Sequence, residues 1–244
     1  MTKPFLIIQL RPEDEAADDE LRSIRHYGGL DEGEVVRLRV EDTGLPDIRL
    51  DAHAAIIVGG SPFDISTPES EKPPIQRKIE SDFMALLDAV VGSDFPFLGA
   101  CSGNGLLGKY CGATISRRYA EPVGGADITL THEGARDSLL EGLPRRFRVL
   151  LGHKEACDST PAGATLLITG NQCPVQMFRV GENVYATQFH PEADPGEFRL
   201  RIDTYREYGY FEPQEAEQIK VRIHQKATPY AQTLLRRFVE RYYY

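Results

Sequence analysis

The stretch PFLGACSGNGLLGKY, residues 96–110, joins a short apolar run to a glycine-rich turn and then to a segment that can form a helix. Such a strand, turn and helix unit is typical of α/β domains. Cys101 stands at the turn between Gly99 and Gly103, which lack the Cβ atoms that would collide in a sharp bend. The unit therefore predicts a strained turn that exposes a thiol at the end of a strand.

The same glycines also fit two phosphate-binding patterns. Gly103, Gly105 and Gly108 spell G-x-G-x-x-G, but the next strand-like run follows too soon for the unit of about 30 residues that a dinucleotide site needs. The run from Gly103 to Lys109 spells G-x-x-x-x-G-K, but Tyr110 stands where a Ser or Thr hydroxyl should bind magnesium. We therefore interpret Gly105, Gly108 and Lys109 as the start of a tightly packed helix.

Other apolar runs punctuated by Gly and Pro recur on both sides of this unit. Several are apolar nearly throughout, which is typical of strands covered on both faces. Apolar residues at helical spacing predict a helix over 73–92. Acidic residues at the start and a glycine pair at the end predict another helix over 18–29. The alternation predicts a three-layer α/β/α fold around a mostly parallel sheet, with strands expected at 5–10, 35–40, 54–60, 96–100, 147–152, 165–170 and 184–189.

The pattern changes at about residue 196. Three amphipathic segments, 196–211, 213–227 and 229–244, carry proline at or near their starts and no strand lies between them. We expect these C-terminal helices to form a cap on the core, so that 1–244 make up a single domain.

Composition excludes several classes of function. The formal charge of -9 and a pI near 5.2 leave no broad basic face for nucleic acid. The four cysteines show no paired Cys/His spacing of a structural zinc site, so we expect no metal. We find no signal segment or membrane-spanning run, and we predict a cytoplasmic protein with no membrane partner.

A thiolate nucleophile needs a base, and the base needs an orienting partner. The run VYATQFHPE predicts a strand over 184–190, from which His190 emerges at the C-terminal edge, with Glu192 beyond Pro191 able to accept the imidazole N–H. Cys101 would lie at the same edge, where the helix N-terminus should lower the pKa of the thiol. Gly59 and Gly60 end another strand and could complete an oxyanion hole, although a glycine pair taken alone is more often a plain turn.

Together, IIVGGSP, LGACSGNG and YATQFHPE resemble the class I glutamine amidotransferases, and most closely the amidotransferase domain of GMP synthase and its stand-alone relatives. The resemblance implies a flavodoxin-like architecture, Cys101 as nucleophile, His190 as general base and acid, and Glu192 as its orienter. It also implies that the amides of Gly60 and Ser102 form the oxyanion hole and that no cofactor is required.

By this resemblance the chain is a cysteine-dependent hydrolase that cleaves the side-chain amide of glutamine or a γ-glutamyl compound through a γ-glutamyl thioester. The family commonly has a glutamine where this chain has Gly105, so substrate recognition should differ. His153 follows a strand and is a candidate for substrate contact. The alternatives left open are a γ-glutamyl peptide hydrolase, a subunit that is silent without a synthetase partner, and a member that binds its ligand without cutting it.

Overall fold

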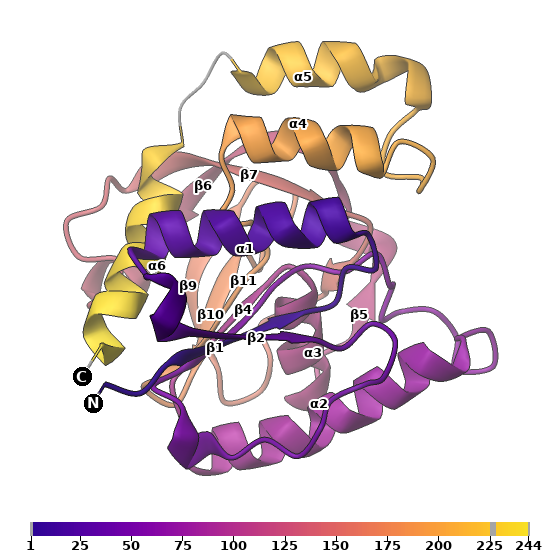
Figure 1. The fold of residues 1–244 in the computed structure, drawn as a ribbon. Coiled ribbons are helices and arrows are strands. Elements are labelled where there is room, and N and C mark those ends of the chain that lie inside the picture. Colours follow the sequence, from indigo (N-terminus) through magenta and orange to yellow (C-terminus); the bar gives the residue numbers. More distant parts are fainter. Residues whose placement is uncertain (1, 225–227, 244) are drawn as a thin grey trace.

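The computed structural model describes residues 2–224 and 228–243 (Figure 1). Its main feature is a nine-stranded sheet with the order β2-β1-β3-β4-β11-β10-β9-β6-β7, and a separate two-stranded sheet pairs β5 with β8. The strands are β1 Phe5–Gln9, β2 Val35–Arg39, β3 Ile56–Val58, β4 Phe97–Ala100, β5 Ile115–Ser116, β6 Glu121–Leu130, β7 Arg146–His153, β8 Ala156–Cys157, β9 Thr165–Gly170, β10 Met177–Val180 and β11 Val184–Thr187.

The sheet is mixed. Neighbours from β2 to β11 in the sheet order pair in parallel, whereas β11, β10, β9, β6 and β7 pair antiparallel. The predicted α/β fold is confirmed, but the expectation of a mostly parallel sheet missed β6 and β10. Antiparallel strands need no crossover helix, so the pattern of alternating strands and helices could not reveal them.

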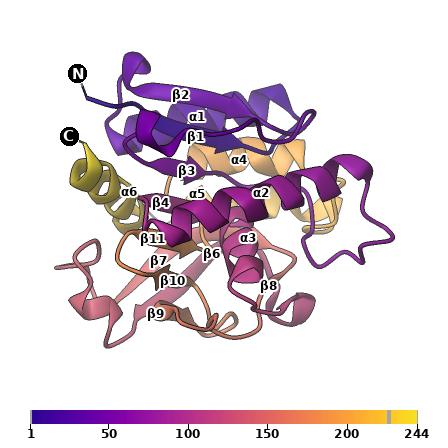
Figure 2. The same ribbon diagram turned by 90° about the horizontal axis from the view of Figure 1, so that it is seen from below.

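Helices cover both faces of the sheet (Figure 2). Along β1, Phe5 and Ile7 pack on the side of α1 and α6, while Leu6 and Ile8 pack on the side of α2 and α3, as the two-residue strand period requires. The flanking helices are α1 Asp14–Gly28, α2 Pro74–Gly92, α3 Ser102–Tyr110 and α6 Pro229–Tyr242. Buried apolar side chains on both faces explain why β3 and β4 are apolar throughout and why β1 is apolar except for Gln9.

The C-terminal helices divide between two places. α4 (Pro195–Thr204) and α5 (Ala216–His224) pack together over Leu150 in a small apolar cluster, beside the main sheet (Figure 1). α6 instead joins the core layer beside α1, where Leu234 and Phe238 are fully buried. The helices were predicted at these places, but only α4 and α5 lie as a cap. The end of the predicted segment 213–227 falls outside the described residues.

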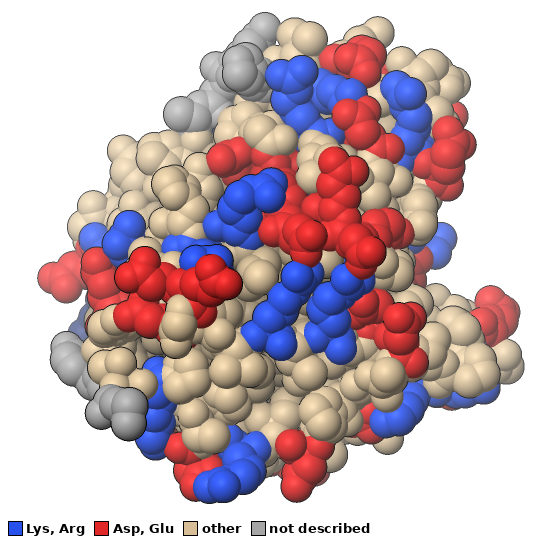
Figure 3. All heavy atoms as spheres, in the orientation of Figure 1, with Lys and Arg blue, Asp and Glu red and all other residues tan. Residues whose placement is uncertain are grey.

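Charged side chains of both signs alternate on the face shown in Figure 3, and no broad basic patch lies there. Ion pairs join β2 to α1, in which Arg37 contacts Asp18 at 2.7 Å and Arg39 contacts Asp14. Among the described helices, none combines the length and apolar character needed to cross a membrane.

Candidate active site

Three neighbouring parallel strands end side by side at one edge of the sheet. β4 lies between β3 and β11, and all three run in the same direction. Cys101 follows β4, Gly59 and Gly60 follow β3, and His190 lies just beyond β11. The topology therefore gathers at one edge residues that are 130 positions apart along the chain.

Cys101 occupies the strained turn that the glycines predict. Its φ of 53° and ψ of -94° lie in a region that few non-glycine residues adopt. A Cβ at Gly99 would stand 2.7 and 2.8 Å from the carbonyl carbon and oxygen of Gly103, so the turn needs glycine there. The Cys101 N–H donates to Thr187 O at 2.8 Å, which ties the turn to β11. α3 begins at Ser102, so the N–H groups of its first turn, which have no acceptor within the helix, lie beside the sulfur.

His190 and Glu192 form a buried pair. The imidazole Nδ1 lies 2.8 Å from Glu192 Oε1, and the backbone N–H of His190 donates to Leu150 O at 3.1 Å. The strand predicted over 184–190 ends earlier, at Thr187, where its pairing with β4 ends at Ala100. His190 thus reaches the site from a loop anchored on Leu150.

Two arginines that the sequence analysis overlooked complete the site. Arg201, on α4, donates from Nη2 to Glu192 Oε1 at 2.8 Å. Arg11 donates from Nε to Glu20 Oε1 at 2.8 Å and from Nη1 to the hydroxyl of Tyr205 at 3.1 Å. Arg11 follows the apolar run of β1, so the strand-end argument that singled out Cys101 would also have found it.

The predicted oxyanion donors differ in availability. The N–H of Ser102 stands at the first position of α3, where helices have no internal acceptor. The N–H of Gly60 donates to Glu20 Oε1 at 3.2 Å, and a Cβ on Gly59 would run into the same carboxylate. Gly60 also adjoins His190, because a Cβ there would stand 3.0 Å from its Cε1. Gly60 could therefore serve an oxyanion only after its bond to Glu20 opens.

The electrostatics of the site favour a neutral Cys101 thiol and a neutral His190 imidazole beside an ionised Glu192. Burial raises the pKa of the Cys101 thiol to about 12, although the charges of Arg11 and Arg201 act to lower it. Burial and the Arg201 charge lower the pKa of His190, against the effect of Glu192. The pKa of Glu192 lies well below its usual range, since His190 and Arg201 outweigh the cost of burial. The expectation of a lowered thiol pKa omitted this burial cost, which exceeds the combined effect of the Arg11 and Arg201 charges.

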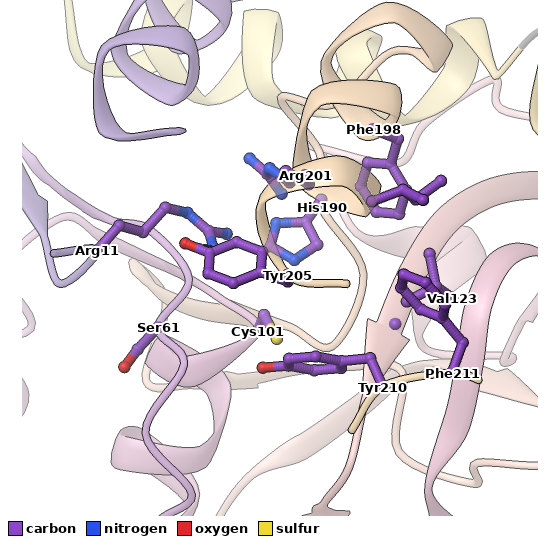
Figure 4. A pocket seen from close by; sticks show the side chains of 12 residues that line it. Arg11, Ser61, Cys101, Val123, His190, Phe198, Arg201, Tyr205, Tyr210 and Phe211 are labelled. Carbon is purple, nitrogen blue, oxygen red and sulfur yellow. Dashed lines mark hydrogen bonds between the residues drawn. The ribbon is translucent and has the colours of Figure 1, made fainter. Parts of the chain in front are cut away.

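Two hollows meet at Cys101, and both are lined by Ser61, Cys101 and Tyr210. The first, here called the His190 hollow, has a cavity volume of about 40 Å³, opens to solvent, and is also lined by Arg11, Val123, Gly152, His190, Phe198, Arg201, Ile202, Tyr205 and Phe211 (Figure 4). The second, here called the Gly105 hollow, has a cavity volume of about 20 Å³, opens to solvent, and is also lined by Phe63, Asp64, Ser102, Gly105, Ile115, His153, Lys154, Glu155, Ala156 and Gln188.

The remaining glycines of α3 serve packing. A Cβ on Gly105 would stand 2.6 Å from Ile65 Cδ1, and a Cβ on Gly108 would collide with the sulfur of Cys157. Lys109 is held in an ion pair with Glu80, with Nζ 2.7 Å from Oε2. The close packing of α3 and the ion pair of Lys109 therefore account for the residues that fit the phosphate-binding patterns. This packing also places Ile65 where a longer side chain at position 105 would reach.

His153 belongs to a second buried group of Cys, His and Glu. Ligand-type atoms of Glu121, His153 and Cys173 lie within 4.8 Å of one another, so by chemistry this group could hold a metal ion. The ring is already engaged on both sides, because Nδ1 lies 2.9 Å from Glu155 O and Nε2 lies 3.1 Å from Glu121 Oε2. Cys173 is fully buried and lines neither hollow, so a substrate that reaches Cys101 does not meet it. Of this group, only His153 was a predicted site residue.

Residues 22–203, more than half of the chain, match the family described as "Glutamine amidotransferase class-I". The fold is that of an α/β protein with a cysteine in a strained turn at a strand end, and this chain belongs to the class I glutamine amidotransferase family. The family that the sequence resembles is thereby confirmed.

The curated relatives include glutamine-hydrolyzing GMP synthases and subunits of such synthases. The chain is 28% identical over 151 residues to a glutamine-hydrolyzing GMP synthase subunit of Pyrococcus abyssi, covering 62% of this chain and 72% of the relative. It is 33% identical over 100 residues to the corresponding subunit of Methanobrevibacter smithii, covering 41% and 51%. The chain is 26% identical over 160 residues to the glutamine-hydrolyzing GMP synthase of Borrelia garinii subsp. bavariensis. This match covers 66% of this chain but only 28% of the relative.

Solved structures match the fold along nearly the whole chain. A glutamine amidotransferase from Thermotoga maritima gives a TM-score of 0.70 at 22% identity and covers 97% of this chain and 98% of that one. A glutamine amido transferase from Methylobacillus flagellatus gives a TM-score of 0.73 at 16% identity, and the match covers 98% of this chain and 95% of that one. At these identities the likeness supports the architecture, which includes the C-terminal helices.

Proposed function

We propose that this chain is a cysteine-dependent amidohydrolase that cleaves the side-chain amide of glutamine or a γ-glutamyl compound, as its family suggests. The observation that carries the proposal is the strained Cys101 turn beside the buried His190 and Glu192 pair, at one hollow. In this assignment Cys101 is the nucleophile, His190 the general base and acid, and Glu192 the group that orients the imidazole.

The first half of the reaction forms an acyl-enzyme. Because Nδ1 of His190 faces Glu192, Nε2 is free to take the proton of the Cys101 thiol as the sulfur attacks the amide carbon. The sulfur–carbon bond forms, the carbon–nitrogen bond breaks, and His190 passes the proton to the leaving nitrogen. The α3 N-terminus at Ser102 supports the negative charge on the carbonyl oxygen.

The second half releases the acid. Water attacks the thioester carbon while His190 accepts one of its protons, the sulfur–carbon bond breaks, and His190 returns the proton to Cys101. The products are a γ-carboxylate and an amine, or ammonia when the substrate is glutamine. Since burial keeps the resting thiol neutral, proton transfer to His190 accompanies the attack in this scheme.

The test is hydrolysis by purified protein of glutamine and of γ-glutamyl peptides, assayed for ammonia, amine and glutamate. Cys101→Ala should abolish turnover, whereas Cys111→Ala, at a half-buried cysteine that lines neither hollow, should leave it intact. Intact-mass measurement after rapid quenching should show an acyl adduct on the wild-type protein and none on C101A. Full turnover by C101A would rule the mechanism out.

One observation favours a second candidate, in which a separate synthetase partner activates this chain. The Gly60 N–H is tied to Glu20, so an oxyanion hole that includes it requires a rearrangement that a docked partner could supply. The relatives that are subunits of GMP synthases motivate the choice of partner. Glutaminase activity that rises when the synthetase component of a GMP synthase is added would support this candidate, and rates that stay the same would count against it.

A further inference from the structure

When the amide carbon of a substrate lies at the Cys101 sulfur, the acyl part of the substrate extends in one direction and its amine part in another. The two hollows that meet at Cys101 offer these two directions. His190 lines only the first, and in the proposed function it protonates the leaving nitrogen. The amine must therefore leave through the His190 hollow, which places the acyl part in the Gly105 hollow.

The Gly105 hollow suits the charged end of a γ-glutamyl group. Asp64, Lys154 and Glu155 line it, so it offers charges of both signs to an α-amino group and an α-carboxylate. Lys154 Nζ lies 3.0 Å from Asp64 Oδ1, and Glu155 accepts the N–H groups of Ile65 and Ser66 at 2.6 and 2.7 Å. These contacts fix the charges in place before a substrate arrives.

The His190 hollow opens to solvent, and its walls are chiefly apolar and aromatic. Figure 4 shows Tyr205, Tyr210, Phe211, Phe198 and Val123 around the space beside Cys101. The described lining includes no aspartate or glutamate. An amine with a large apolar group would bury that group here, whereas a second cationic group would meet no counter-charge.

The two charged side chains that line this hollow are arginines, and each has N–H groups without an acceptor among the described residues. Arg201 is 6% exposed, and its Nε and Nη1 have no acceptor among the described residues. Arg11 uses Nε and Nη1 for Glu20 and Tyr205, and its Nη2 lies against Gly60 without an acceptor in the described part of the chain. Arginine binds carboxylates through paired hydrogen bonds, so these groups fit an amine that carries a carboxylate.

Part of this hollow comes from outside the matched family region. Tyr205, Tyr210 and Phe211 follow residue 203, where that match ends, and they reach the site from the connection between α4 and α5. The shape of the hollow is thus a feature on which this chain can differ from other members of the family.

We propose, resting on the proposed function and extending it to a substrate class, that the preferred substrate is a γ-glutamyl amide of a large apolar or aromatic α-amino acid. Its side chain would pack against Phe198 and Phe211, and its carboxylate would bind Arg11 and Arg201. Hydrolysis of the γ-amide bond would then release glutamate and the free amino acid.

The experiment compares kcat/KM for four substrates of the wild-type protein: γ-glutamylphenylalanine, γ-glutamylphenethylamide, γ-glutamylputrescine and glutamine. The first two differ only in the carboxylate, and a charge-assisted hydrogen bond predicts an advantage of about 10- to 100-fold for the dipeptide. The phenethylamide should exceed glutamine through apolar burial, and the cationic putrescine derivative should be poorest. Turnover of glutamine that depends on Cys101 and equals or exceeds that of the dipeptide would overturn this inference but leave the proposed function standing.

Variants give a second measurement. Phe211→Ala should lower kcat/KM for γ-glutamylphenylalanine by a larger factor than for glutamine, and Arg11→Lys should erode the preference for the dipeptide over the phenethylamide. Val221→Ala, on the exposed side of α5, is the matched control and should leave the ratios unchanged. Equal kcat/KM for dipeptide and phenethylamide in the wild type would refute the arginine assignment. Absence of Cys101-dependent cleavage of every γ-glutamyl compound would refute both the inference and the proposed function.

Discussion

Arg201 and His190 donate to the same carboxylate oxygen. Oε1 of Glu192 lies 2.8 Å from His190 Nδ1 and 2.8 Å from Arg201 Nη2, and all three side chains are buried. Arg201 also pairs with Glu197, whose pKa burial raises to about 8. A helix of the C-terminal region is thereby coupled to the proposed base, so α4 helps to hold Glu192 in the orientation that catalysis would use.

This contact predicts a shift in pH dependence. After burial, the Arg201 charge is the largest cause of the lowered pKa of His190, and Arg11 acts in the same direction. Arg201→Met removes a cation that disfavours imidazolium, so the pKa of His190 should rise. Since the base must be neutral, the acid limb of kcat/KM should move to higher pH, and kcat should fall because Glu192 loses a partner.

The control for this prediction is Arg179→Met, which removes an arginine that pairs with Asp137 and Glu182 and lines neither hollow. Its pH profile should match that of the wild type. If Arg201→Met lowers kcat with an unmoved acid limb, then Arg201 supports the fold near the site without acting on His190.

The reactivity of Cys101 provides a separate check on the resting state. Burial raises the pKa of this thiol to about 12, so its thiolate fraction should be small at neutral pH and should grow as the pH rises. The rate of carbamidomethylation, followed by intact mass, should therefore keep rising from pH 7 to beyond pH 9. A plateau below pH 7 would instead show a thiolate and imidazolium pair at rest.

Gly99 should be intolerant of a side chain. A methyl group there would meet the backbone of Gly103, which cannot turn aside as a flexible side chain can. We expect Gly99→Ala to lower the free energy of unfolding by about 1–3 kcal/mol, the usual cost of overpacking. Urea denaturation measures this change.

Gly92→Ala is the matched control for Gly99→Ala. Gly92 ends α2 and has no atom near its built Cβ, so alanine there should be neutral or stabilise by up to about 1 kcal/mol. Equal stability of both variants would show that the turn around Cys101 has room that its geometry does not suggest.

The sequence predicted those parts of the molecule whose signals are local. The apolar runs of β1 and β4 predict strands, and the glycines around Cys101 predict a tight turn, each from the local sequence alone. The structure has each of these features where it was predicted. The α/β class and the family followed from them. The roles assigned to Cys101, His190 and Glu192 remain predictions, although His190 and Glu192 do lie in contact.

What the sequence did not predict depends on contacts between distant segments. Arg201 lies nine residues beyond Glu192, within a segment predicted as an amphipathic helix, and no motif there marks it as a site residue. The bond between Glu20 and Gly60 joins residues 40 positions apart, and no spacing signal marks it. The raised pKa of Cys101 likewise comes from burial by chain that is remote in sequence.

Glu80 illustrates the same point and gives a further prediction. It accepts from Lys72 at 2.6 Å and from Lys109 at 2.7 Å, which accounts for the lysine of the apparent phosphate-binding pattern. Burial tends to raise the pKa of Glu80, but its hydrogen bonds to the two lysines outweigh this and lower it. A depressed folded-state pKa means that the carboxylate stabilises the fold above its unfolded pKa of about 4.3. This contribution is lost as the pH falls through the folded-state pKa.

Glu80→Gln should therefore lower the free energy of unfolding at pH 7 by about 1–3 kcal/mol, because it leaves the buried Lys72 with only the exposed Glu69, 3.1 Å away, as a counter-charge. It should also weaken the decline in stability as the pH falls below about 4.3, where the wild-type carboxylate loses its charge. Asp51→Asn, at an exposed pair with Arg49, is the control and should leave stability almost unchanged, because solvent screens such pairs. Urea unfolding of both variants at pH 7 and pH 4 measures these effects. Identical pH dependence in Glu80→Gln and the wild type would contradict the assigned role of the carboxylate.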